Sequence, residues 1–415
     1  MKFNKWTVGL AALGVVSLVS ARADEAPAAA PAAAVQNYLE TSTKGISISG
    51  YVDTSVEWAM YPGTERSAES PIGAIPFRSG VNSSKQDGFN MNVVELNIEK
   101  PLDEAPAASG FKIQLIAGPD AEWYNQNNPN DPNSYADNGF AIKQAYVAVR
   151  APVGNGIDFK IGVFDTIIGY EVFESGSNPN FTRSWGYNLE PTEHEGILAS
   201  YKVNDNISAS FGIANTLSPG IEARNNKDGP GGFDSFWCKT YMASLTLTAP
   251  QSWGFLGGSA LYAGFVQGFS TAGDNSPNLS LDDDQLNFYM GAVINTPVAG
   301  LTAGLAYDYV DYSIARGPGN AEINNIGVYS TYKVTEKLSV SGRYEYGWRG
   351  NSTSGTGTIS QGDLPNDTCY WGLTGTIQYD IWQNVISRLE IRHEEDSSFT
   401  ESCGTGLYLN LIYKF

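Results

Sequence analysis

The sequence predicts an all-β fold: a transmembrane antiparallel up-and-down β-barrel of about 16 strands with an inward-folded third long loop. Three observations lead to this prediction. Apolar and polar residues alternate along many segments, the connections are short and long in turn, and the last segment alternates strictly up to Phe415. Membrane strands need about 9–11 residues, whereas strands of soluble proteins centre on about five or six. A soluble sandwich or propeller has no reason to alternate its loop lengths so regularly.

Composition and charge agree with a membrane protein built from strands. Of the 415 residues 42% are hydrophobic, and beyond the N-terminus no apolar run approaches the roughly 20 residues of a spanning helix. The chain has 44 acidic and 25 basic residues, a formal net charge of -19. An acidic chain without a basic stripe argues against nucleic acid as a partner. Its charge would concentrate cations near a pore, unless most of it only solvates loops.

The N-terminus predicts export. Lys2 and Lys5 precede an apolar run, and Ala21-Arg22-Ala23 supplies a small-x-small cleavage pattern. A membrane anchor is the alternative, but the run is too short for it. We therefore expect a signal peptide at 1–23, an Ala/Pro-rich N-terminal segment without assigned function at 24–44, and an outer-membrane β-barrel at 45–415.

The strands are predicted from a period of two, which begins at Gly45. In this first segment Val52, Val56 and Trp58 share one face, while Asp53 and Glu57 share the other. Further strands are predicted at 89–100, 110–121, 139–151, 157–164, 196–203, 207–216, 236–249, 258–270, 284–296, 301–313, 323–334, 337–349, 369–381, 385–395 and 404–415. Long connections are predicted at 62–88, 122–138, 164–195, 217–235, 271–283, 314–322, 351–367 and 396–403.

The connection 164–195 is the candidate functional site. It has no period of two, and loops longer than about 12 residues are usually functional or disordered. We interpret it as a loop that folds into the barrel and narrows the lumen, where opposed acids and a base orient dipolar solutes. The alternative is that these charges pair with each other or with the wall and only pin the loop. The candidate constriction residues are Glu171, Glu174, Arg183, Glu190, Glu193 and Glu195.

Candidate residues of the pore wall follow from the same alternation. Along 337–349, Val340 and Tyr344 face lipid, which leaves Arg343 in the lumen. Arginine on the lipid face at mid-bilayer would cost about 2–4 kcal/mol. A solvated lumen surface without a role in selectivity is the alternative. The pore-wall residues predicted in this way are Asp53, Glu57, Glu95, Lys112, Arg343, Glu345, Arg388, Glu390 and Arg392, with Glu99, Lys160 and Glu394 inward by the same rule.

Two features of the wall stay open at this point. Strand 139–151 is ambiguous, because Lys143 and Arg150 lie on opposite faces of a regular strand. The inward tyrosines are interpreted as interior packing, with a track for sugars as the alternative. These tyrosines are Tyr51, Tyr262, Tyr289, Tyr329 and Tyr408.

The C-terminal strand carries the most specific pattern. Leu407, Leu409, Leu411, Tyr413 and Phe415 share one face, and Phe415 is the last residue. This resembles the C-terminal signature of bacterial outer-membrane barrels. The resemblance implies that Tyr413 and Phe415 form an assembly signal for the barrel-assembly machinery, and that the protein resides in the bacterial outer membrane.

The whole chain after the signal peptide resembles bacterial outer-membrane porins. The block from Gly162 to Glu171, followed by Asn180, Arg183-Ser184 and Pro191, is most similar to the OmpL-like β-barrel porin family. The resemblance implies a water-filled diffusion channel for small hydrophilic solutes, surrounded by outer-membrane lipids and lipopolysaccharide, and it allows a homotrimer. General porins often carry Pro-Glu-Phe at the constriction. This chain has Pro179-Asn180-Phe181, so that acidic role cannot be assigned to Asn180.

The expected function is a cation-preferring channel and not an enzyme. A hydrolase would need a nucleophile, a base and an orienting group, and His194 and His393 are the only histidines. A structural or adhesive barrel with surface-exposed binding loops is the alternative. No cofactor or metal is expected, because His194 between two glutamates in a loop favours hydrogen bonding.

Two surface features are left as alternatives. The predicted topology places Cys369 and Cys403 on neighbouring loops, which allows one disulfide in an exported protein and leaves Cys238 over. The run Asp282–Asp284 is interpreted as solvated surface, with divalent bridging to lipopolysaccharide as the alternative.

Overall fold

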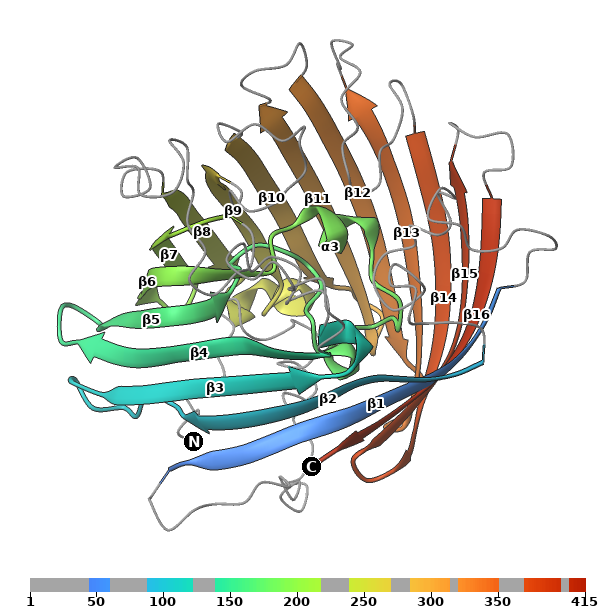
Figure 1. Cartoon of the computed structure of the whole chain (residues 1–415), viewed down its shortest axis with the longest axis horizontal. Helices are drawn as coiled ribbons and strands as arrows, with labels where there is room; N and C mark the ends of the chain where they lie inside the picture. The colour runs from blue at the N-terminus through green and yellow to red at the C-terminus, as the bar shows by residue number, and fades with distance from the viewer. Residues whose placement is uncertain are drawn as a thin grey trace.

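Sixteen strands form one closed antiparallel barrel in the computed structural model (Figure 1). Each strand pairs with its neighbours in sequence, and β1 pairs with β16 to close the ring. The structure describes residues 45–59, 88–121, 139–217, 239–269, 284–313, 320–350, 369–396 and 403–415. The predicted fold class and strand number are therefore confirmed.

The observed strands lie within a few residues of the predicted ranges. They are β1 (Ser47–Ala59), β2 (Gly88–Lys100), β3 (Ser109–Ala117), β4 (Phe140–Ala151), β5 (Ile157–Asp165), β6 (Glu193–Asn204), β7 (Ile207–Ala214), β8 (Thr240–Thr248), β9 (Ala260–Phe269), β10 (Asp284–Asn295), β11 (Leu301–Ser313), β12 (Asn320–Lys333), β13 (Leu338–Gly350), β14 (Cys369–Trp382), β15 (Val385–Asp396) and β16 (Cys403–Lys414). Short helical turns are η1 (Pro119–Ala121), η2 (Ser175–Ser177), α3 (Trp185–Leu189) and η3 (Gln251–Leu256). None of the helices in the described ranges is long and apolar enough to cross a membrane.

The alternation of side chains sets which face of the wall is apolar and exposed. In β13, Val340 and Tyr344 are 43% and 45% exposed, whereas Arg343 between them is 1% exposed. The same contrast runs along β15, where Leu389 is exposed and Arg388 is buried. A bilayer accepts the first set of side chains, and the barrel interior holds the second.

A β-bulge resolves the ambiguity of β4. The register against β3 shifts between Gln114 and Leu115, so that Lys143 is the extra residue. As a result Lys143 and Gln144 are both buried, at 1% and 0% exposure. The extra residue inverts the parity of the strand beyond it. Both Lys143 and Arg150 can therefore face inward.

The boundary of the long connection differs from its prediction. Strand β6 begins at Glu193, because Glu193 to Glu195 pair with Val163 to Asp165 of β5. The connection is thus 166–192. Glu195 shares a face with Ile197, which is 49% exposed, so strand alternation places Glu195 on the outer face. The prediction that Glu193 and Glu195 belong to the long connection is wrong, because both lie in β6.

The C-terminal residue takes part in closing the barrel. Phe415 and Gly50 exchange two backbone hydrogen bonds, each 2.9 Å long. The side chains of Tyr413 and Phe415 are 50% and 38% exposed, on the outward face. Their role as an assembly signal stays a prediction.

Several predictions fall on other parts of the chain. The signal peptide at 1–23, the segment 24–44, Cys238 and the side chains of Asp282–Asp284 lie outside the described residues, and so does the side chain of Cys403. Strand order places β15 between β14 and β16, which carry Cys369 and Cys403. The backbones of β14 and β16 are therefore separated by two strand spacings, about 9.6 Å. A disulfide spans at most roughly 7 Å between Cα atoms. This arrangement disfavours the disulfide.

Candidate functional site

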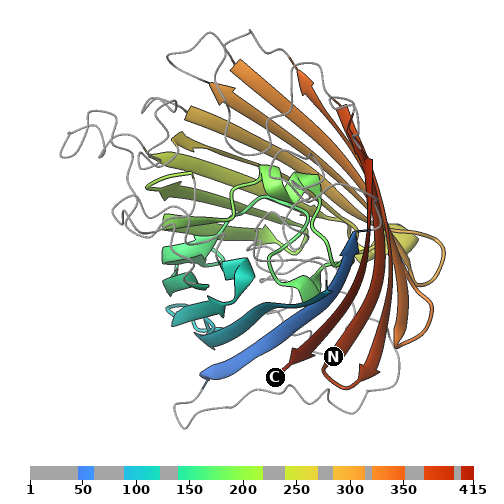
Figure 2. The same ribbon diagram turned by 45° about the vertical axis from the view of Figure 1, so that its right-hand side comes forward.

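The connection between β5 and β6 is a folded segment with local structure of its own. The Thr166 N–H donates to the Thr192 carbonyl (3.0 Å), so the segment leaves and rejoins the wall at one place. The Ser184 hydroxyl accepts a hydrogen bond from the Tyr187 N–H (3.0 Å) and so caps the start of α3. We call residues 166–192 the inner segment, because Figures 1 and 2 draw it within the ring of strands.

Apolar side chains of the inner segment pack on two separate parts of the wall. Phe173 and Tyr187 belong to a buried cluster with Tyr51 of β1 and Ile412 of β16. Ile168 belongs to a second cluster, which includes Leu198, Met242, Val266 and Tyr289 from β6, β8, β9 and β10. The segment therefore contacts widely separated strands through side chains that exclude water.

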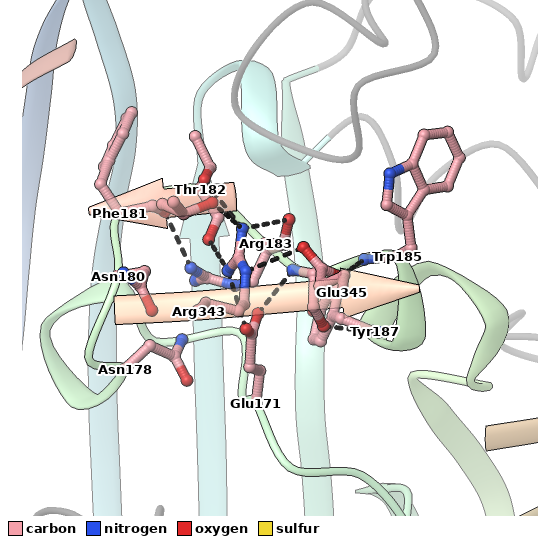
Figure 3. A network of polar contacts seen from close by, with 12 residues as sticks. Glu171, Asn178, Asn180, Phe181, Thr182, Arg183, Trp185, Tyr187, Arg343 and Glu345 are labelled. Atoms are coloured by element: carbon pink, nitrogen blue, oxygen red, sulfur yellow. Dashed lines mark hydrogen bonds and ion pairs between the residues drawn. The ribbon is translucent and has the colours of Figure 1, made fainter. Parts of the chain in front are cut away.

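The centre of the site is Arg343 of β13 (Figure 3). Its guanidinium lies 2.9 Å from Glu171 of the inner segment through Nη1 and 2.9 Å from Glu345 of its own strand through Nε. It also donates to the Thr182 carbonyl (2.7 Å) and to the Arg183 carbonyl (3.2 Å). A planar guanidinium with five donors suits this convergence of oxygens. Arg343 thereby joins the wall to two different stretches of the segment.

The carboxylates of this network hold backbone N–H groups. Glu171 accepts from the Ser184 N–H (2.8 Å), and Glu345 accepts from the Trp185 N–H (2.5 Å). Figure 3 shows both carboxylates beside Arg343 while the Trp185 ring points away from them. The start of α3 is thus fixed by charge-assisted hydrogen bonds, which are stronger than neutral ones.

Strand β15 contributes a second row of contacts. Glu390 accepts from the Phe181 N–H (2.5 Å) and from the Thr182 N–H (2.9 Å). Arg388 donates to the carbonyls of Ser175 (2.8 Å) and Asn178 (2.9 Å). Five of the predicted wall residues, Arg343, Glu345, Arg388, Glu390 and Arg392, therefore contact the inner segment or one another, and each is at most 3% exposed.

Arg183 lies inside the inner segment. It is 0% exposed and donates to the carbonyls of Phe181 (3.1 Å) and Phe173 (2.5 Å). Its guanidinium also lies 5.5 Å from the centre of the Tyr187 ring. Asn180, from the Pro-Asn-Phe sequence, donates to Thr376 (2.6 Å) and is likewise 0% exposed. Both side chains hold the shape of the segment.

Glu174 attaches the segment to the opposite part of the wall. It accepts from Gln114 of β3 (2.6 Å) and lies 3.2 Å from the ammonium of Lys143. Burial alone would raise the pKa of Glu174, but the charges of Lys143 and Lys112 and the Gln114 hydrogen bond lower it to about 2. Its side chain keeps 24% exposure, the most of any constriction residue in an ion pair.

Glu190 lies near the C-terminal end of the segment and has an acidic neighbour. Burial, together with the charge and hydrogen bond of Asp308 in β11, raises the pKa of Glu190 well above its usual value. A side chain on Gly169 would meet the Glu190 carboxyl, and Gly169 has a φ of +120°. Glycine is therefore required where Glu190 packs on the backbone.

The remaining predicted residues line other parts of the interior. Asp53 and Glu57 of β1 are 0% exposed, and Asp53 accepts from Asn92 (2.8 Å) and Asn410 (2.7 Å). Glu95 is 2% exposed and accepts from Asn97 (2.5 Å). Lys112 is half-buried.

Four of the inward tyrosines are at most 5% exposed: Tyr51, Tyr289, Tyr329 and Tyr408. Tyr329 stacks on Tyr170 with ring centres 4.0 Å apart. These observations agree with interior packing.

The two histidines lie on different strands. His194 of β6 is 1% exposed and shares a hydrogen bond with Thr166 (3.1 Å). His393 of β15 shares one with Thr405 (2.8 Å). Since alternate residues of β6 face opposite sides, His194 and Glu195 do not converge. In the described ranges, no group of three or more His, Cys, Asp or Glu side chains could hold a metal ion.

Sequence reasoning did not find three residues that hold the segment. Thr182 accepts and donates within the Arg343 and Glu390 network. Lys143 binds Asp165 (2.6 Å) and Glu174, and Asp308 faces Glu190. The conflicting parity of Lys143 was a usable signal, because a bulge explains how both basic residues of β4 face inward. Neither Thr182 nor Asp308 stands out by pattern.

Solved structures with a similar fold include outer-membrane channels and porins. The outer-membrane channel DcaP of Acinetobacter baumannii aligns with a TM-score of 0.56 at 12% identity, over 90% of this chain and 99% of that one. OmpF of Salmonella typhi gives 0.55 at 12%, over 91% and 100%. The anion-selective porin of Comamonas acidovorans gives 0.54 at 12%, over 89% and 99%. At this identity the likeness shows the fold alone.

The sequence itself matches a family of porins. No curated protein matches the chain. The family described as "Putative beta-barrel porin-2, OmpL-like" matches residues 45–409, which is most of the chain and the whole extent of the barrel except its last residues. With the closed barrel, this match places the protein in the bacterial outer membrane. The chain belongs to the OmpL-like β-barrel porin family.

Proposed function

We propose that the barrel is a diffusion channel for small hydrophilic solutes, with the inner segment as its constriction. The observation that supports this most is the attachment of the inner segment to both β3–β4 and β13–β15. Glu174 reaches the first part of the wall, and Glu171 reaches the second through Arg343. A segment held at two sides of a lumen narrows the remaining path without needing to move.

Cation preference is the finer part of the proposal. The chain has a net charge of -19, and the buried Arg343 and Arg392 are paired with Glu171, Glu345 and Glu394. Paired charges contribute little net field. Lys143 is shared between Asp165 (2.6 Å) and Glu174 (3.2 Å), so part of the negative charge of the partly exposed Glu174 is left to act on the path. Homotrimer formation is a further proposal, by likeness to the trimer form of OmpT of Vibrio cholerae (TM-score 0.53, 13% identity over 89% of this chain and 99% of that one).

A planar-bilayer recording of the refolded barrel in a salt gradient tests both parts. We expect steady open conductance with a cation-selective reversal potential, and Glu174→Gln should lower the cation-to-anion permeability ratio by roughly twofold. Glu336→Gln, at an exposed position in the β12–β13 turn, is the matched control. An anion-selective reversal potential would keep the channel and overturn its cation preference.

A structural or adhesive barrel is the second candidate. It is favoured by the burial of inward side chains such as Asp53, Glu57 and Tyr408, which are at most 2% exposed and so do not line open water. This candidate predicts a correctly folded barrel without conductance. The same recording therefore separates the two.

A further inference from the structure

Two inward lysines differ from the other basic side chains of the lumen. Lys112 of β3 and Lys160 of β5 lie on either side of β4, where the register pairs Lys112 with Tyr146 and Lys160 with Ala148. Neither lysine forms an ion pair with a residue in the described ranges, whereas Lys143, Arg343 and Arg392 each do. In a strongly acidic chain, two inward ammonium groups outside any ion pair are unexpected.

Lys160 lacks a hydrogen-bond acceptor. The residue is 5% exposed, and its ammonium makes no hydrogen bond to any part of the chain that the structure describes. This group lies 4.9 Å from the centre of the Tyr146 ring. A cation–π contact stabilises a buried ammonium by less than the cost of burying an isolated charge. An anion supplied from the lumen would remove this deficit.

The charges that face Lys160 leave a surplus of one positive charge. They come from Lys112, Lys143, Asp165 and Glu99. Asp165 binds Lys143 with both oxygens, at 2.6 and 2.7 Å, so that pair is complete. Glu99 lies opposite Lys112 in the β2–β3 register. Lys112 also faces the carboxylates of Glu95 and Glu174. Lys160 is therefore the ammonium that no carboxylate pairs with, and one singly charged anion would balance it.

The surroundings of the two lysines are apolar on one side. Leu102, from the short turn that precedes β3, clusters with Ala108 and Ala148, and Tyr146 packs against them. Both lysines lie near the start of their strands, directly after short turns, and so near the end of the barrel where the connections are short. They are thus separate from the Arg343 network that holds the inner segment.

We propose that Lys112, Lys160 and the Tyr146 ring form a binding site for a small monocarboxylate near the short-turn end of the lumen. The carboxylate oxygens accept from the two ammonium groups, and a short aliphatic body packs on Leu102 and Tyr146. Inorganic phosphate lacks such a body and carries more charge than the site offers. The role of the site as a step for anionic solutes rests on the proposed channel, but binding itself does not.

Titration of butyrate into the folded barrel in detergent, followed by calorimetry, tests the site. Lys160→Met keeps the length of the side chain and removes the ammonium, and we expect butyrate to bind about tenfold or more weakly. Lys112→Gln, at a half-buried position, should weaken binding as well. Lys337→Gln, in the exposed β12–β13 turn, is the control with the same change of charge. Butyrate affinity of Lys160→Met equal to that of the control would overturn the proposal.

Conductance in potassium butyrate separates this proposal from that of the channel. If the barrel conducts, its butyrate current should saturate with butyrate concentration, and in Lys160→Met it should saturate at a higher concentration. This result supports both the channel and the site. A silent barrel that still binds butyrate through Lys160 would overturn the channel and keep the site. Conductance with no butyrate binding in the wild type would overturn the site and keep the channel.

Discussion

Two parts of the same wall use inward charges in opposite ways. Along β13–β15, Arg343, Arg392 and Glu390 are at most 1% exposed and are engaged by carboxylates, carbonyls or backbone N–H groups. Along β3–β5, Lys112 and Lys160 form no ion pair with a described residue, and Lys160 makes no hydrogen bond among them. The first arrangement holds the inner segment in place. The second leaves charge for a solute.

The difference shows that an inward charge is not by itself a pore-lining charge. Alternation of side chains decides only which face a residue occupies. Whether it meets water depends on what packs against that face, and the inner segment covers the charges of β13–β15. Removing single partners on each side tests this comparison.

The largest effect is expected for Arg343→Gln. It leaves Glu171 buried without its cation and leaves Glu345 with Arg392 alone, 3.5 Å away. Removing one partner of a buried ion pair costs about 3–5 kcal/mol. The measurement is hydrogen exchange of the Thr182, Ser184 and Trp185 amides, which should speed up about a hundredfold or more. Unchanged exchange at these amides would contradict the assigned role.

Arg150→Gln is the matched control for this arginine. Arg150 binds Asp158 through Nε (2.5 Å), but the two side chains keep 19% and 23% exposure. Partly exposed pairs contribute about 1 kcal/mol or less. The control should therefore leave exchange in the inner segment unchanged.

A smaller effect is expected for Glu390→Gln. The carboxylate accepts from the N–H groups of Phe181 and Thr182 and from the hydroxyls of Thr182 and Thr376. The glutamine amide keeps one acceptor oxygen, but its NH2 group replaces the other oxygen and faces groups that donate. The loss should reduce the stability of the attached segment by about 1.5–3 kcal/mol. Exchange of the Phe181 amide should speed up by about tenfold or more. Equal exchange in wild type and variant would show that these bonds do not hold the segment.

The parts of the inner segment around Glu174 and around Glu190 should respond to pH in opposite directions. The pKa of Glu174 is lowered to about 2, so its ionised contacts stabilise the fold above its usual pKa of about 4.5 and are lost as pH falls toward 2. The pKa of Glu190 is raised well above 4.5, so its neutral form stabilises the fold at low pH and is lost as pH rises through that pKa. The charges facing Glu190 are Asp308 and Glu171.

Hydrogen exchange at two pH values measures this difference, after correction for the intrinsic pH dependence of exchange. Going from about pH 5 to about pH 8 should loosen amides near Glu190 by a few-fold and leave those near Glu174 unchanged. Glu190→Gln should abolish the change, because an amide does not titrate. Equal acceleration of exchange near Glu174 and near Glu190 in the wild type would contradict the assignment.

Much of the fold could be predicted from single residues and their period. The alternation in β13 and β15 placed Arg343 and Arg388 inward, and the terminal pattern up to Phe415 marked the last strand. These predictions succeed because a bilayer imposes one strong requirement, an apolar outer face, on every strand. The boundary at Glu193 was missed because pairing with Asp165 extends β6 by three residues that show no apolar pattern.

By itself, then, the sequence determined the class of fold, the strand order and the face of most side chains, because these follow from local period and from the bilayer. Only the tertiary structure decided which inward charges are paired. Arg343 forms an ion pair with Glu171, which lies 172 positions away in the sequence, whereas Lys160 forms no ion pair within the described ranges. Such contacts depend on how a folded segment packs across a closed barrel. No local pattern encodes that distance.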